Sequence, residues 1–344
     1  MRVVSMDAVE PGQFLGRTVF SGNGAVLLAE GVQLTVYMIS TLRRIGVTML
    51  YIQDPAFSDV EIEEVVSEES KRALITRMGD MMEAVRSGKD FNTRSISVAV
   101  DRLLEDVVQN REVLFQLSDI RTKDNAMYLH ALNVSTMAAL IGINAGLNQL
   151  QLKELVIGAL LHDIGKTESI TDDTSEDRKR HHTWRGFELL KNKREFSLLI
   201  AHVALQHHEA PDGSGLPRGL DREGIHLYAL ITAVANTYDN LLNNAATGQG
   251  MMPHEACEYM MALAGTKLDR EVLIHFLRTV SIYPTGSSVR LSTKETGVVV
   301  GQHRGLPGRP VVRVVRSGHE KNDLEVKEID LARHTTVFIE SVQR

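Results

Sequence analysis

The feature that most constrains this chain is an aspartate on the apolar face of a predicted helix. The apolar positions of that helix recur at helical spacing and are Leu152, Leu155, Val156, Ala159 and Leu160. Asp163 lies eleven residues after Leu152, so at about 3.6 residues per turn it falls about 20° from Leu152 around the helix axis. An ionised carboxylate is costly to bury unless it is paired or bound to a metal ion. The fold must therefore bring cations or hydrogen-bond donors to Asp163.

Several histidines lie on or near the apolar faces of neighbouring helical patterns. They are His130, His162, His182, His207 and His208. A single histidine on an apolar face is usually a hydrogen-bonded core residue. Several inward histidines around one aspartate are harder to satisfy with hydrogen bonds alone, and metal ions would satisfy them all. We therefore interpret the set as a metal site.

The ligand types and their spacing indicate what kind of metal site this is. Imidazole and carboxylate together suit Fe, Mn, Zn, Ni or Co and do not choose among them. The neighbours His162 and Asp163, like His207 and His208, diverge by about 100° on a helix, so each pair can serve two ions. Asp163 has two oxygens and can bridge. Two ions about 3.5–4 Å apart can hold a bridging hydroxide and clamp a phosphate ester.

Composition excludes several other classes of protein. The 344 residues carry a net charge of −6, which argues against a partner of duplex nucleic acid. Cys257 is the single cysteine, which excludes an internal disulfide framework and thiolate clusters. Charged residues and a proline interrupt the first eleven positions, so we expect no signal peptide. Apolar runs stay shorter than about 18 residues, so we expect no membrane span and a cytoplasmic protein.

The periodicity of the sequence changes along the chain and predicts four parts. Residues 1–53 read as a small β-rich module, 54–111 as a helical linker, 112–282 as a helical domain with most of the histidines, and 283–344 as a β appendage. The predicted fold class is therefore mainly α, with a small N-terminal β-containing module and a small C-terminal β domain.

At these histidines the sequence resembles the HD-GYP family, a branch of the HD phosphohydrolase superfamily. The segments that carry the resemblance are HALNV at 130–134, HDIGK at 162–166, His182 with Gly186, and HHEAPDGSGLP at 207–217. The resemblance implies a helical bundle core and bacterial signalling. It also implies a metal-dependent phosphodiesterase that hydrolyses cyclic di-GMP to linear pGpG or GMP by a metal-bridging hydroxide. It implies two divalent ions, with Fe or Mn expected before Zn, Ni or Co.

The resemblance also assigns roles by position. Metal binding falls on His130, His162, Asp163, His182, His207, His208 and Asn236. Asp163 and Lys166 are the expected catalytic residues, and Lys166 matches the lysine that meets a substrate phosphate. An ammonium group at that place would stabilise phosphate charge, although Lys166 alone could equally be a solvated lysine at a helix end.

Four positions depart from the family pattern. Leu216 replaces the tyrosine of GYP, and Ala126 replaces a glutamate that supports a third ion in some members. Asn236 stands where the family has a metal-binding aspartate, and residues 245–248 lack the arginines that would hold the phosphates. These departures keep three alternatives open: a catalytically weakened signalling module that binds a cyclic nucleotide or protein partner, another HD-superfamily reaction, or a purely structural histidine core. A homodimer or a signalling-protein partner is also left open.

Overall fold

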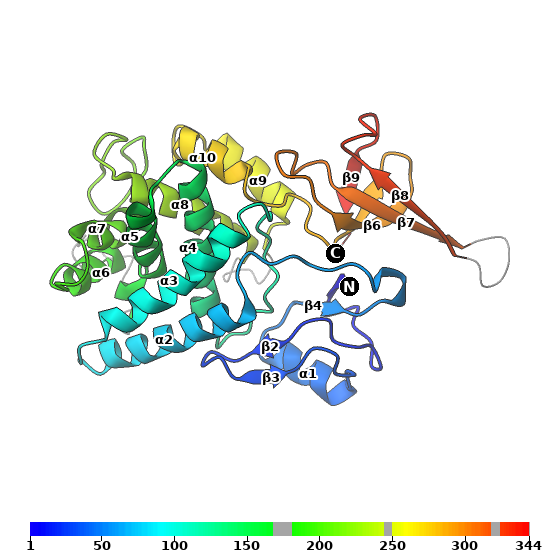
Figure 1. Cartoon of the computed structure of the whole chain (residues 1–344), viewed down its shortest axis with the longest axis horizontal. Helices are drawn as coiled ribbons and strands as arrows, with labels where there is room; N and C mark the ends of the chain where they lie inside the picture. Colours follow the sequence, from blue (N-terminus) through cyan, green and yellow to red (C-terminus); the bar gives the residue numbers. More distant parts are fainter. Residues whose placement is uncertain (168–180, 244–249, 318–323, 344) are drawn as a thin grey trace. The chain divides into compact units, whose positions relative to one another are not determined.

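The computed structural model describes residues 1–167, 181–243, 250–317 and 324–343, and its ribbon is drawn in Figure 1. The chain forms two compact units. Unit 1 consists of Met1–Glu64, Glu112–Ala126 and Val280–Arg344, and unit 2 of Val65–Arg111 and Met127–Thr279. Each unit is thus assembled from separate stretches of sequence. The four-part division predicted above stays a prediction.

The N-terminal part of unit 1 contains two short antiparallel pairs and one helix. Strand β1 (Arg2–Ser5) pairs with β4 (Met49–Ile52), and β2 (Val19–Phe20) pairs with β3 (Val26–Leu28). Helix α1 (Val36–Arg44) begins where the Thr35 side chain accepts a hydrogen bond from the Met38 amide. A short 3₁₀ turn, η1, follows β4 at Pro55–Phe57. Leu15, Leu34, Leu42 and Leu50 are among the fully buried residues of this small core.

The C-terminal part of unit 1 is a five-stranded antiparallel sheet in the order β8-β7-β6-β5-β9. The strands are β5 (Ser288–Leu291), β6 (Thr296–Gly301), β7 (Val311–Ser317), β8 (Leu324–Asp330) and β9 (Ile339–Val342). Its buried core includes Val289, Leu291, Val299 and Val312. The other side of the sheet is partly covered as well, because Val298 packs against Phe57 and Val60.

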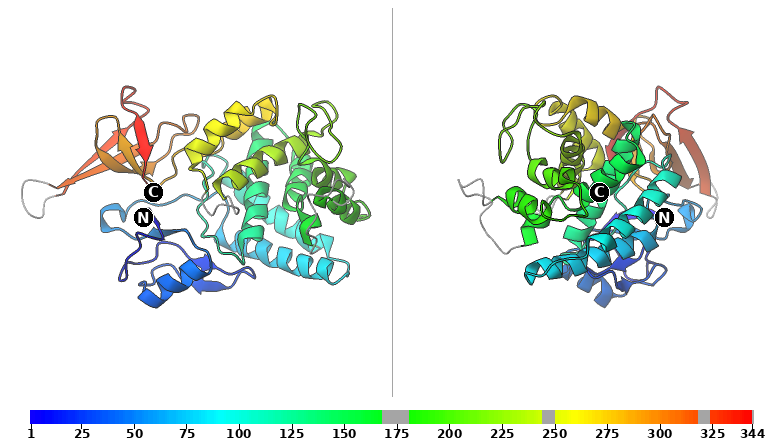
Figure 2. Two further views of the ribbon diagram at one scale, coloured as in Figure 1. Left: turned by 180° about the vertical axis from the view of Figure 1, so that it is seen from behind. Right: turned by 60° about the vertical axis from the view of Figure 1, so that its left-hand side comes forward.

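Unit 2 is helical; Figures 1 and 2 show its helices in colours from cyan to yellow. They are α2 (Glu68–Arg86), α3 (Thr93–Gln109), α4 (Ala126–Asn144, whose first residue belongs to unit 1), α5 (Gln149–Leu160), η2 (Ile164–Thr167), α6 (His182–Leu190), α7 (Leu198–Gln206), α8 (Leu227–Leu242), α9 (Pro253–Ala262) and α10 (Arg270–Leu277). The observed architecture confirms the predicted fold class.

Helix α4 is apolar on nearly all sides, which is typical of a helix in the interior of a protein. In the part of the chain that the structure describes, it is the one helix whose length and composition would allow it to cross a membrane. About 72% of its apolar window is buried inside the protein, so it packs as a core helix. His130 and Asn133 interrupt its apolar run, as expected from the sequence, although its mean hydropathy is high enough for a membrane span. The cytoplasmic location stays a prediction.

Candidate metal centre

Two of the histidines are positioned by the ends of helices. His162 follows the last residues of α5, and its Nδ1 lies 2.7 Å from the carbonyl oxygen of Ala159. His207 ends α7, and its Nδ1 lies 2.9 Å from the carbonyl oxygen of Ala204. The last carbonyls of a helix lack an intrahelical partner, so here they accept hydrogen bonds from the rings. Nδ1 then carries the proton, and Nε2 of each ring keeps a lone pair.

Asp163 lies between two pairs of histidine rings. Its Oδ2 atom is 3.5 Å from His162 Nε2 and 3.8 Å from His130 Nε2. Its Oδ1 atom is 3.3 Å from His182 Nε2 and 3.5 Å from His207 Nε2. Within each pair the two Nε2 atoms also converge, at 3.2 Å for His130 and His162 and 3.3 Å for His182 and His207. Each carboxylate oxygen therefore faces its own pair of nitrogen lone pairs.

His208 joins the second pair. Its ring centroid lies 5.1 Å from that of His182 and 4.2 Å from that of His207. The adjacent His181, which the sequence analysis did not nominate, lies 5.8 Å from His208 between ring centroids, and its side chain caps α6. The structure thus brings six predicted residues together: His130, His162, Asp163, His182, His207 and His208.

The geometry of the turn η2 explains why the HDIGK segment has a glycine and a lysine at positions 165 and 166. A Cβ atom at Gly165 would lie 2.0 Å from the carbonyl oxygen of His182, so only glycine lets η2 and the start of α6 approach so closely. The Nζ atom of Lys166 lies 2.7 Å from Asp163 Oδ2, and the lysine side chain is 45% exposed. Lys166 therefore lies at the open side of the cluster, next to the carboxylate.

Burial controls the protonation of the cluster. It lowers the pKa of His162 to about 3 and also lowers the pKa of His207. Burial and the neighbouring rings hold the pKa of His208 well below its usual range. For Asp163 burial acts in the raising direction, but His162, His182, His207 and Lys166 outweigh it and hold the carboxyl pKa well below normal. Neutral imidazoles around an ionised carboxylate are the states that bind cations.

The donor set has the imidazole and carboxylate ligands that a divalent transition ion binds. The described residues form two ligand groups, one of His130, His162 and Asp163 and one of Asp163, His182, His207 and His208, with the donor atoms of each within 4.8 Å of one another. Asp163 is shared by both. Its buried Oδ1 accepts no hydrogen bond of good geometry within the described residues, which is costly for a carboxylate unless a cation meets it. The cluster is compatible with a metal site.

His130 is held differently from His162 and His207, by a residue that the sequence analysis missed. Asp239 on α8 is buried, and its Oδ2 lies 2.6 Å from His130 Nδ1. The Asn133 side-chain amide donates to Asp239 Oδ1 at 3.2 Å. A buried aspartate three residues after Asn236 on one helix could have been noticed in the sequence, but its partner lies 109 positions away.

Three of the remaining predicted positions lie on α8, at the start of α4 and in the loop after His208. Asn236 is buried on α8, one turn before Asp239, and its Oδ1 accepts a hydrogen bond from Asn240 at 2.7 Å. Ala126 is the first residue of α4, one turn before His130. Leu216 is 44% exposed, and the backbone of its loop is held by Glu209, whose buried carboxylate accepts from the Arg218 and Leu220 amides. Residues 245–248 lie outside the described residues.

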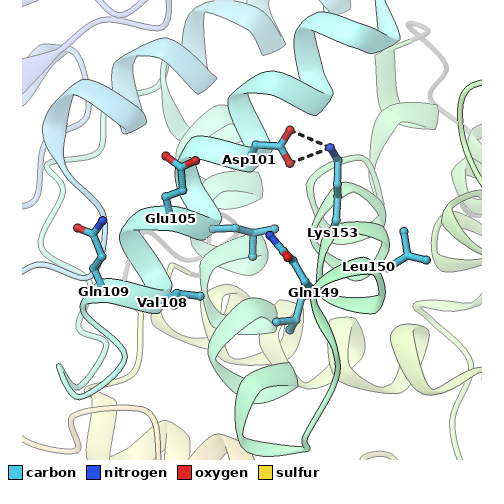
Figure 3. A pocket seen from close by; sticks show the side chains of 9 residues that line it. Asp101, Glu105, Val108, Gln109, Gln149, Leu150 and Lys153 are labelled. Carbon is cyan, nitrogen blue, oxygen red and sulfur yellow. Dashed lines mark hydrogen bonds and ion pairs between the residues drawn. The ribbon is translucent and has the colours of Figure 1, made fainter.

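A cavity of about 900 Å³ lies elsewhere in unit 2, between α3 and α5. Figure 3 shows Asp101 and Lys153 paired across its rim, with Leu150 beside them. Its lining contains none of the histidines of the cluster. The cavity therefore offers no alternative position for the chemistry that the histidines and Asp163 can support.

The histidines of the cluster and Asp163 fall within a stretch that matches a known protein family. A family model described as an HD domain matches residues 102–272, and one described as a KOW domain associated with HD domain matches 288–344. The chain is 30% identical over 77% of its length to the cyclic di-GMP phosphodiesterase PA4108 of Pseudomonas aeruginosa. It is 29% identical over 66% to the cyclic di-GMP phosphodiesterase response regulator RpfG of Xanthomonas campestris, and 32% identical over 48% to a cyclic di-GMP phosphodiesterase of Thermotoga maritima. It spans 65%, 64% and 48% of the length of these three relatives.

Proposed function

The chain is an HD domain protein related to the HD-GYP cyclic di-GMP phosphodiesterases, and on this premise we propose that it hydrolyses cyclic di-GMP. The products would be linear pGpG, GMP or both, and two divalent ions, Fe or Mn before Zn, Ni or Co, would be required. The activity would serve bacterial signalling in the cytoplasm.

The observation that carries this proposal is the position of Asp163 between two pairs of histidine nitrogens. One carboxylate that faces two ligand groups is suited to bridging two ions. Ions held there would act as Lewis acids on a phosphate ester and would activate water for in-line attack. A phosphodiester needs this help because its own negative charge repels nucleophiles.

The residues of the chain supply three further contributions. The hydrogen bonds of His162 and His207 to helix carbonyls fix the rings before any ion arrives. Burial of the cluster limits access of bulk water and strengthens electrostatic interactions. Lys166, partly exposed at the open side, can move from Asp163 to a substrate phosphate when cations neutralise the carboxylate.

The test combines metal analysis with a chromatographic assay of cyclic di-GMP. Anaerobically prepared, metal-supplemented protein should hold close to two first-row ions per chain and convert cyclic di-GMP to linear product. Asp163→Ala should lose both properties. Asp101→Ala is the matched control. Asp101 lies on the surface of α3 and pairs with Lys153 of α5, so its removal should leave metal content and cyclic di-GMP hydrolysis unchanged. Less than about half an ion per wild-type chain would refute the proposal.

One observation favours a second candidate, a weakened module that binds a cyclic nucleotide without turning it over efficiently. Asn236 carries no charge, and its oxygen is already engaged by Asn240. A metal position that depended on this residue would keep uncompensated positive charge. Tight binding of cyclic di-GMP by metal-loaded protein, without release of product over many hours, would favour this candidate over the enzyme.

A further inference from the structure

Asp239 is placed to control His130, although nothing in the sequence motifs assigns it a role. Its side chain is 1% exposed, and its Oδ2 lies 2.6 Å from His130 Nδ1. Its Oδ1 accepts a hydrogen bond from Asn133, which lies one turn after His130 on α4. Asn133, Asp239 and His130 therefore form a buried chain of hydrogen bonds that ends at the ring whose Nε2 faces Asp163.

This chain of hydrogen bonds is needed because of where the histidines lie on their helices. His162 and His207 are at helix ends, where free backbone carbonyls accept from Nδ1. His130 lies inside α4, where backbone carbonyls are already bonded to amides four residues later. A side chain from another helix must therefore supply the acceptor, and Asp239 on α8 does so.

We infer that Asp239 is a positioning residue of the metal centre that holds His130 in the tautomer with Nε2 unprotonated. The inference rests on the proposed function, because it requires an ion at Nε2. A carboxylate behind a ligating imidazole also makes the ring a stronger donor. The negative charge of Asp239 thereby acts on the ion through the His130 ring. Asn236, on the same helix α8, is neutral and contributes no negative charge of its own.

The structure indicates how Asp239→Asn would fail. Asn133 donates to the oxygen at the Oδ1 position, so the new amide would turn its own oxygen toward Asn133 and its NH₂ group toward His130. An NH₂ donor facing Nδ1 would force the proton onto Nε2, the atom needed for the ion. The variant keeps the shape of the side chain and changes only the direction of one hydrogen bond.

The experiment measures Co²⁺ binding to metal-free protein by competition with a chelator, together with thermal unfolding of the metal-free form. We expect Asp239→Asn to weaken one of two Co²⁺ positions by roughly tenfold to a hundredfold, with no loss of thermal stability in the metal-free form. In a His130→Ala background the same change should have no further effect, because it acts through that ring. Asp101→Asn should bind Co²⁺ like the wild type.

Three results would overturn the inference. The first is wild-type Co²⁺ affinity in Asp239→Asn, and the second is an equal loss in the His130→Ala background. Both leave the proposed function standing. The third, a wild-type chain that binds no Co²⁺, Mn²⁺ or Fe²⁺, overturns the proposed function as well. If Asp239→Asn does not fold, Asn133→Ala is measured in its place. We expect this variant to bind Co²⁺ severalfold more weakly at one position. Unchanged Co²⁺ affinity in Asn133→Ala would overturn the inference.

Discussion

The Nζ atom of Lys166 lies 2.7 Å from Oδ2 of Asp163, the same oxygen that faces His130 and His162. The lysine therefore lies on the side of the carboxylate that one ion of the proposed pair would take. A bound metal ion would compete with the lysine for this oxygen, and a substrate phosphate would offer the displaced ammonium group a new partner. On the proposed function, metal loading and phosphate capture would be coupled through this one side chain.

Lys166→Met should separate these two roles. Removing the competing ammonium should raise metal affinity, by up to about fivefold for a half-exposed ion pair. The same change should raise the Michaelis constant for cyclic di-GMP, because one charged phosphate contact is lost. Metal titration and steady-state kinetics check both effects. Lower metal affinity in Lys166→Met would contradict the competition.

Gly165→Ala should disrupt the cluster, because the new methyl group would collide with the carbonyl oxygen of His182. We expect a loss of about 1–3 kcal/mol in the free energy of unfolding and reduced metal content, since His182 must move. Gly79→Ala in α2 is the matched control. No neighbouring atom lies within 4 Å of its new Cβ, so it should stabilise the protein by about 0.5–1 kcal/mol. Urea unfolding measures both; equal effects would contradict the steric argument.

Glu209→Ala should loosen the loop after His208. The Glu209 carboxylate accepts from the Arg218 amide at 2.7 Å and the Leu220 amide at 2.9 Å. Each amide left without a partner costs about 1–3 kcal/mol where water cannot reach it. We expect faster amide hydrogen exchange across residues 216–220 and lower stability. Unchanged exchange in that loop would mean that other contacts hold it.

The metal-free protein should lose stability as the pH falls below about 6.5. The pKa of His162 is about 3 in the folded protein, against an ordinary value of 6.5. Above 6.5 both states are neutral and the contribution is fully present. Between 6.5 and 3 only the unfolded chain takes up a proton, so unfolding becomes easier by about 1.4 kcal/mol per pH unit for one such group. Urea unfolding at pH 7, 6 and 5 measures this slope, and His162→Gln should flatten it. The same slope in both proteins would show that His162 titrates normally.

Asn236→Asp should increase metal affinity if Asn236 lies near an ion. A carboxylate would neutralise cation charge that the amide leaves uncompensated. Turnover of cyclic di-GMP should rise with it, and the Michaelis constant should change less. Chelator competition and product chromatography give the two values. Unchanged metal affinity would place Asn236 outside the coordination of either ion.

The fold class and the cluster could be predicted because their evidence is local. The apolar stripe from Leu152 to Leu160 predicts the buried helix α5, but the prediction that Asp163 lies on that helix was wrong, because α5 ends at Leu160 and Asp163 lies in the turn that follows. Asp239 and Glu209 could not be found in this way. Asp239 acts on a ring 109 positions away, and Glu209 acts on amides of a loop whose path no periodicity describes. Helical periodicity indicates which residues are buried, but not which buried residues meet.

The interleaving of the two units has a consequence for how the chain is made. Helices α2 and α3 belong to unit 2, but the rest of that unit is completed only at Thr279, after residues 112–126 have contributed to unit 1. Helix α3 packs against α2, which precedes it, and against α5, which ends at Leu160. At about 5–20 residues per second, α3 is complete roughly three to ten seconds before α5, and the part of its apolar face that α5 covers stays exposed for that time. Unit 1 waits longer still, because its C-terminal sheet is synthesised after unit 2. Unit 1 can therefore finish folding only after the whole of unit 2 has been synthesised.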